Sequence, residues 1–146
     1  MSSSPANEIM LERNKSLARR IFDYFNRHDL DAIGREHSSN YVSHVAGGQP
    51  MDWPAHRQMI EVFYHAFPDF RLSIEDLIGE NDKITIRFTA EGTHQGPFQG
   101  IPPTGKKVKM DGIVIMRFAA DKRVEEWLII DSMGLMLQLG AKPPSA

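Results

Sequence analysis

Asp131 is the residue whose type and position point most directly to chemistry. It ends a run, 124–131, that is otherwise rich in β-branched and aromatic side chains, and an apolar stretch, 132–140, follows at once. A carboxylate at the end of an apolar strand is costly to bury without a partner. It therefore either caps the next helix, a position for which Ser132 competes, or holds a proton for catalysis. The sequence alone leaves both interpretations open.

His94 is the second candidate for chemistry. Imidazole titrates near neutrality, so His94 could shuttle a proton or donate a hydrogen bond to a carbonyl group. The alternative is that it pins the adjacent Gly/Pro-rich loop, 96–105. His44, before a flexible Gly-Gly segment, and His56, on the core face of a helix, are more often structural histidines than catalysts, although both could line a site.

An apolar pocket would suit a carboxylate that must hold a proton. Large apolar side chains could line such a pocket, although most side chains of this kind are simply core. The candidates are Trp53, Phe63, Phe67, Phe88, Met110 and Trp127.

Composition restricts the class of protein. The chain has 146 residues and a formal net charge of -2, so we expect one domain over 1–146, with an ordered core of about 8–141, that binds no nucleic acid. It has no cysteine and no long apolar run, which favours a cytoplasmic protein away from membranes. Two or three histidines with Asp131 could ligate zinc or iron, but their spacing is not diagnostic, and we expect neither metal nor cofactor.

The elements that must position these residues change character along the chain. Apolar residues recur at helical spacing in 5–26, 30–37 and 53–67, so the first half is expected to be helical. From residue 70 the period is two, which predicts a long antiparallel meander whose strands include 84–91, 107–118 and 124–131. Both faces of the strand 124–131 are apolar. We therefore expect helices on one side of the sheet and a second subunit, in a homodimer, on the other.

Several short segments together resemble the SnoaL-like polyketide cyclases, also called ester cyclases. The resemblance covers about residues 15–143 and rests on 67–69 (Phe-Pro-Asp), 92–96 (Gly-Thr-His-Gln-Gly), 100–106 (Gly-Ile-Pro-Pro-Thr-Gly-Lys), Glu126-Trp127 with Asp131, and 138–141 (Gln-Leu-Gly-Ala). It implies an α+β fold of the nuclear transport factor 2 type. In that fold, a cone-shaped, curved antiparallel sheet carries N-terminal helices on its concave face, around a deep apolar pocket.

The resemblance also implies a chemistry. In the anthracycline cyclases, an aspartate is taken as the acid/base for an intramolecular aldol ring closure without metal or cofactor. Carried over, Asp131 would remove a proton next to a carbonyl, and His94, in the family's Thr-His-x-Gly segment, would assist. Where those cyclases place a pocket histidine before Met-Arg, this sequence has Ile115, which makes the site more apolar.

The leading hypothesis is therefore an enzyme that cyclises or isomerises a small carbonyl compound. One alternative is epoxide opening, which requires Arg87 or Arg117 to reach Asp131 and a second carboxylate. The other is a dimer that binds a small apolar molecule without changing it.

Overall fold

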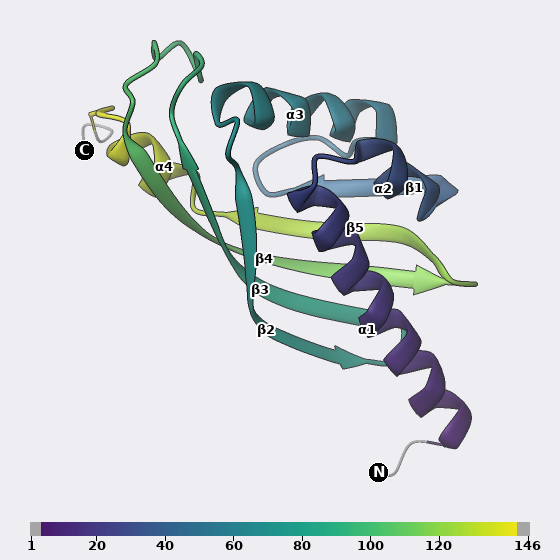
Figure 1. Cartoon of the computed structure of the whole chain (residues 1–146). Helices are drawn as coiled ribbons and strands as arrows, with labels where there is room; N and C mark the ends of the chain where they lie inside the picture. Colours follow the sequence, from purple (N-terminus) through teal and green to yellow (C-terminus); the bar gives the residue numbers. More distant parts are fainter. Residues whose placement is uncertain (1–3, 143–146) are drawn as a thin grey trace.

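The computed structural model describes residues 4–142, which form one curved sheet with helices on one side (Figure 1). Of the residues outside the expected ordered core of 8–141, the structure describes 4–7, which begin the first helix, and Lys142. In chain order the elements are α1 (Pro5–Asn26), α2 (Leu30–Arg35), β1 (His37–Val45), α3 (Trp53–Ala66), β2 (Arg71–Glu80), β3 (Lys83–Thr93), β4 (Lys107–Ala119), β5 (Lys122–Ile130) and α4 (Ser132–Gln138).

Side-chain caps start the two long helices. The Ser4 hydroxyl accepts a hydrogen bond from the backbone N–H of Asn7 at 3.2 Å, and Pro5 occupies the first turn of α1. Asp52 does the same for α3 through the N–H of Ala55 at 3.0 Å. Both helices then turn an apolar stripe towards the sheet, as the helical spacing predicted.

The sheet has the order β1-β5-β4-β3-β2. The pairs β2–β3, β3–β4 and β4–β5 are antiparallel, as the meander predicted. The pair β1–β5 is parallel, so the sheet is mixed rather than wholly antiparallel.

β1 corrects the prediction that helices fill the first half of the chain. The expected helix 30–37 ends at Arg35, and the segment from His37 to Val45 is a strand. Its polar start, 38–40, shows no apolar alternation. The partner that makes it a strand, β5, lies more than eighty residues away.

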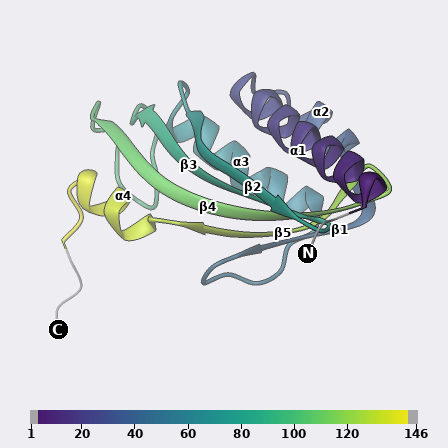
Figure 2. The ribbon, with the colours of Figure 1, turned by 90° about the horizontal axis from the view of Figure 1, so that it is seen from below.

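The α+β architecture with helices on the concave face is confirmed. α1 and α3 lie on the same side of the curved sheet in two perpendicular views, and α4 follows the end of β5 (Figures 1 and 2). One buried apolar cluster joins α1, α2 and α3 to the inward residues of β3 and β4. No helix within residues 4–142 is long and apolar enough to cross a membrane.

Candidate functional site

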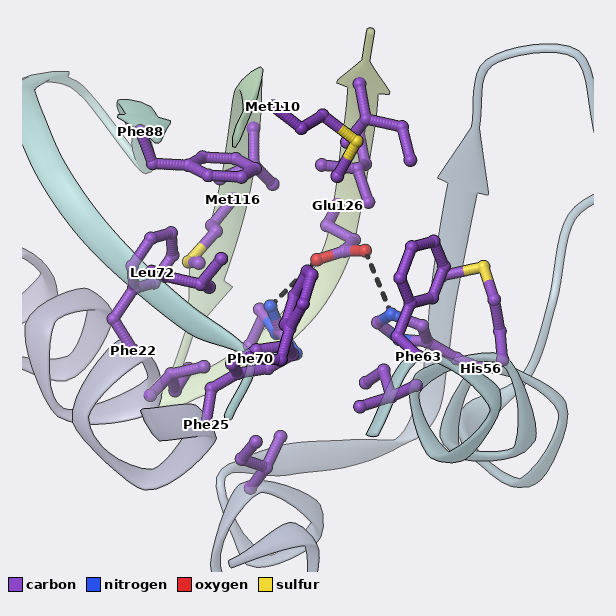
Figure 3. Close-up of a pocket in the computed structure, with 18 residues that line it drawn as sticks. Phe22, Phe25, His56, Phe63, Phe70, Leu72, Phe88, Met110, Met116 and Glu126 are labelled. Carbon is purple, nitrogen blue, oxygen red and sulfur yellow. Dashed lines mark hydrogen bonds and ion pairs between the residues drawn. The ribbon is translucent and has the colours of Figure 1, made fainter. Parts of the chain in front are cut away.

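A pocket lies between the concave face of the sheet and the helices α1 and α3, with a cavity volume of about 90 Å³ (Figure 3). Among the described residues that line it, three are polar: His56, Arg123 and Glu126. The others are apolar or aromatic and include Phe22, Phe25, Phe63, Phe70, Phe88, Met59, Met110 and Met116.

Glu126 enters the pocket because of the alternation of β5. Glu126, Leu128 and Ile130 line the pocket, whereas Trp127 and Ile129 between them do not. The Glu126 side chain is 4 % exposed. A single carboxylate therefore points into an otherwise apolar wall.

Four side chains surround the Glu126 carboxylate. Arg123 Nη1 lies 2.8 Å from Oε1, the Ser43 hydroxyl donates to Oε2 at 2.7 Å, and His56 Nε2 lies 3.5 Å from Oε2. Burial alone would raise the pKa of Glu126. His56, Arg123 and the hydrogen bonds from Ser43 and Tyr41 outweigh that effect and lower the pKa below its ordinary value. Glu126 is therefore a carboxylate at neutral pH.

His56 is held neutral beside this carboxylate. Burial lowers the pKa of His56, and Arg123 lowers it further, against the opposing effect of Glu126. Its Nδ1 lies 3.1 Å from the Tyr41 hydroxyl. With the proton on Nδ1, which the Tyr41 hydroxyl then accepts, His56 Nε2 carries the lone pair, and a proton taken up at Nε2 would face Glu126 Oε2.

His37 fixes the guanidinium of Arg123. Arg123 Nε and Nη2 both donate to His37 Nε2, at 3.0 and 2.6 Å, so His37 is neutral and carries its proton on Nδ1. Burial, then Arg123, lowers the pKa of His37 to about 2. Three of the five N–H groups of Arg123 are thus directed at His37 and Glu126. The other two can serve an oxygen atom of a ligand.

Four of the predicted pocket residues line this cavity: His56, Phe63, Phe88 and Met110. Trp53 and Phe67 do not. Trp53 packs its ring against His37 and His56, and Phe67 is fully buried among other aromatic rings.

Three predicted pocket residues lie on the opposite, outer face of the sheet, which corrects the sequence interpretation. His44 and Trp127 stack there at 5.6 Å between ring centroids. Ile115 pairs with Trp127 across β4 and β5 and shares its face. Because both faces of β5 are apolar, the sequence did not show which face was inside.

Asp131 lies outside the pocket, at the start of α4. It is exposed, and its Oδ1 accepts a hydrogen bond from the backbone N–H of Gly134 at 2.9 Å. A Cβ at position 134 would clash with the Asp131 carboxylate, so glycine allows this cap to form. Of the two interpretations of Asp131, the helix cap is the one found. A catalytic role stays a prediction without support from its position.

His94 is fully buried but is not among the residues that line the cavity. The β3–β4 register is unbroken through Thr93, so no bulge turns His94 outward. Its Nδ1 accepts from the backbone N–H of Thr104 at 3.1 Å, which ties together the two ends of the Gly/Pro-rich loop. Its role as catalyst stays a prediction.

The polar cluster of the pocket was missed as a site. The sequence pattern included Glu126 only as part of a family motif, and it did not indicate Arg123, Tyr41 or His37 as site residues. One signal was present: a charged residue on the face of β5 that otherwise carries Leu128 and Ile130.

Epoxide opening requires an arginine that reaches Asp131 and a second carboxylate, and both candidate arginines bind other carboxylates. Arg87, Asp111 and Asp131 line one shallow hollow on the outer face. However, Arg87 Nε bonds to Asp76 at 2.6 Å and Arg117 bonds to Glu125 at 3.1 Å. Within residues 4–142, no group of three or more His, Cys, Asp or Glu side chains is arranged to hold a metal ion.

Comparisons with known proteins agree with this architecture. A family model described as SnoaL-like polyketide cyclase matches residues 15–139. AclR from Streptomyces galilaeus, a candidate hydroxylase, is 29% identical with a TM-score of 0.86, over 93% of this chain and 86% of that one. A candidate SnoaL-like polyketide cyclase from Jannaschia sp. CCS1 is 20% identical with a TM-score of 0.85, over 98% and 99% of the two chains.

IdmH from Streptomyces antibioticus, a candidate polyketide cyclase, is 26% identical with a TM-score of 0.80, over 88% of this chain and 99% of that one. The fold expected from the sequence, of the nuclear transport factor 2 type, is therefore confirmed. The comparison with curated proteins finds no match.

Proposed function

Because this chain belongs to the SnoaL-like polyketide cyclase family, we propose that it catalyses a cyclase-like acid/base reaction on a small carbonyl compound. The reaction we favour is an intramolecular aldol closure or an isomerisation. The observation that carries the proposal is a neutral histidine, His56, beside a buried carboxylate, Glu126, in an otherwise apolar pocket.

His56 is the proposed catalytic base. Its Nε2 removes a proton from the carbon next to the carbonyl group, and the resulting enolate and imidazolium are a new pair of opposite charges. Glu126 stabilises the imidazolium, and the two remaining N–H groups of Arg123 are available to the enolate oxygen. In an aldol closure the enolate carbon forms the new C–C bond. His56 then returns its proton to the alkoxide oxygen, so no oxidant or reductant is needed.

The proposal is tested with 2-tetralone, a flat, uncharged ketone, in deuterated water. We expect the protein to accelerate deuterium exchange at the carbons next to the carbonyl, measured by NMR. Replacing His56 by Gln should reduce this rate about 100-fold or more, as for loss of a general base.

Asp131→Asn is the matched control, because asparagine also caps helices and only the charge is removed. We expect it to retain the rate of exchange. The opposite pattern, with loss in Asp131→Asn and none in His56→Gln, would return the catalytic role to Asp131.

Glu126→Gln separates a catalytic role from a structural one. Glu126 raises the pKa of His56, so its loss should move the acid limb of the pH–rate profile to lower pH as well as reduce the rate. A rate that falls without a shift of this limb would mean that Glu126 only supports the fold.

A binding protein without catalysis is the second candidate. It is favoured by the full set of partners around Glu126, since a satisfied carboxylate also serves as a structural group. A compound that co-purifies with the protein and stays unchanged on incubation would support this alternative.

A further inference from the structure

The polar side chains of the pocket are gathered at one buried end. His56, Arg123 and Glu126 are each less than 5 % exposed. Tyr41 and His37 pack behind them, and the His37 and Tyr41 rings stack at 3.8 Å between centroids. This end of the pocket is therefore closed by side chains.

Two elements run from the closed end towards solvent. Along β5, Glu126 is buried, whereas Leu128 and Ile130 are half-buried. Along α3, His56 is buried and Phe63 is half-buried. With the usual rise per residue of a strand, the path from Glu126 to Ile130 spans about 13 Å. With that of a helix, the path from His56 to Phe63 spans about 10 Å. The pocket thus runs as a tube from a buried polar bottom to a half-buried apolar mouth. Figure 3 shows Glu126 and His56 among the apolar side chains that line it.

The charge at the bottom is balanced. Arg123 and Glu126 neutralise each other at 2.8 Å, and His56 is neutral. A charged ligand group would add an unpaired charge in an apolar enclosure, which is unfavourable. An uncharged oxygen atom can instead accept the spare N–H groups of Arg123.

The pocket is also small in volume. Its volume of about 90 Å³ is less than the roughly 150 Å³ of an engineered cavity that holds benzene. Three flexible lining side chains, Met59, Met110 and Met116, can move aside. Aromatic side chains from α1, α3 and β3 line the pocket, among them Phe22, Phe63 and Phe88, and such a lining favours contact with an aromatic ring.

We propose that the pocket takes an elongated, uncharged aromatic ketone that enters carbonyl end first, so that the reacting carbon lies at the tip of the molecule rather than at its middle. This inference deepens the proposed function and rests on the same pocket. A carbonyl attached to the side of a fused ring system cannot reach the bottom while the rings fill the tube.

Two isomers test the inference because they differ only in where the carbonyl is attached. In 2-acetylnaphthalene it extends the long axis, and in 1-acetylnaphthalene it projects sideways. By calorimetry we expect the 2-isomer to bind about tenfold or more tightly, since a side-attached carbonyl leaves its hydrogen bonds unmade.

Orientation is measured with 6-fluoro-2-acetylnaphthalene whose acetyl methyl group is labelled with carbon-13. A soluble gadolinium chelate should broaden the fluorine signal, at the mouth, and leave the methyl signal, at the bottom, protected. The variant Arg123→Met removes the N–H groups that bind the carbonyl and should abolish the preference between isomers, whereas Arg117→Met, on the outer face, should retain it.

Equal affinity for the isomers, binding of neither, a methyl signal broadened more than the fluorine signal, or a preference unchanged in Arg123→Met would each overturn the inference. The proposed function fails separately. An isomer preference without deuterium exchange rejects the catalysis alone, and exchange without a preference rejects only the carbonyl-first orientation.

Discussion

Two adjacent glutamates of β5 make the same kinds of contact on opposite faces of the sheet. Glu125, on the outer face, bonds to His44 at 2.7 Å and to Arg117 at 3.1 Å. Glu126, on the inner face, meets His56 at 3.5 Å and Arg123 at 2.8 Å. Each carboxylate therefore has one histidine and one arginine.

The two clusters differ in their access to water. The Glu125 and Arg117 side chains are 24 % and 33 % exposed, whereas those of Glu126 and Arg123 are both 4 % exposed. An ion pair that water can reach contributes little to the free energy of folding, because water weakens the attraction and solvates both charges when they are apart. A buried ion must keep its partners, because nothing else compensates its charge. Burial, rather than the choice of partners, gives the inner cluster its capacity for chemistry.

The largest contrast is expected when each carboxylate loses its arginine. Arg123→Met leaves Glu126 buried without its cation and should lower the free energy of unfolding by about 3–5 kcal/mol. Arg117→Met should cost about 0–1 kcal/mol. Urea unfolding measures both, and similar costs for the two variants would refute the comparison.

Acidification should lower the stability of the fold through His37, on the inner face of the sheet. The unfolded chain protonates His37 near pH 6.5, but in the folded protein the pKa is about 2. Between these values the unfolded state binds the additional proton, so stability falls as pH falls, by at most about 1.4 kcal/mol per unit.

His37→Gln keeps an acceptor for Arg123 and removes this titration. Its free energy of unfolding should therefore vary less between pH 6.5 and 4.5 than that of the wild type, as followed by urea unfolding at several pH values. His44→Gln, on the outer face, is the control. If the two variants have equal pH dependence, the buried neutral His37 is not the cause.

The cap at the end of β5 should have a smaller effect. Asp131→Ala removes the acceptor for the N–H of Gly134 and should cost about 1 kcal/mol, measured by thermal unfolding, while Asp131→Asn should cost little. A large loss in both variants would mean that the charge of Asp131, rather than its cap, matters.

The smallest effect on folding is expected from the exposed apolar side chains of the outer face. Ile113 and Ile129 are 48% and 64% exposed. The homodimer stays a proposal, and these side chains are its natural interface. Ile129→Lys should leave the free energy of unfolding within about 0.5 kcal/mol yet convert a dimer to a monomer in light scattering. A wild type that is already monomeric at micromolar concentration would contradict the proposal.

Patterns local in the sequence predicted most of the fold. The apolar stripe that contains Leu17 and Ile21 predicted α1, and the alternation from Ile84 to Ala90 predicted β3. β1 could not be found this way, since its polar start pairs with a strand that comes much later.

The site was harder to predict than the fold. Leu128 and Trp127 are both apolar, so the sequence did not reveal which face of β5 points inward. Asp131 was therefore expected to face the pocket, whereas it lies outside the pocket at the start of α4. Glu126 becomes a buried carboxylate only because Ser43 and Arg123 meet it there, and Ser43 is 83 positions away. No local pattern encodes that meeting.

The parallel pairing of β1 with β5 also affects synthesis on the ribosome. β1 leaves the exit tunnel early, but the strand it bonds to is made more than eighty residues later. During that interval the nascent chain has helices and an unpaired strand without the polar end of its pocket, and such edges invite wrong pairing. A messenger truncated before residue 122 would therefore yield a chain without the partner strand of β1 and without the His56–Glu126 pair, whereas one that ends after residue 130 would encode both.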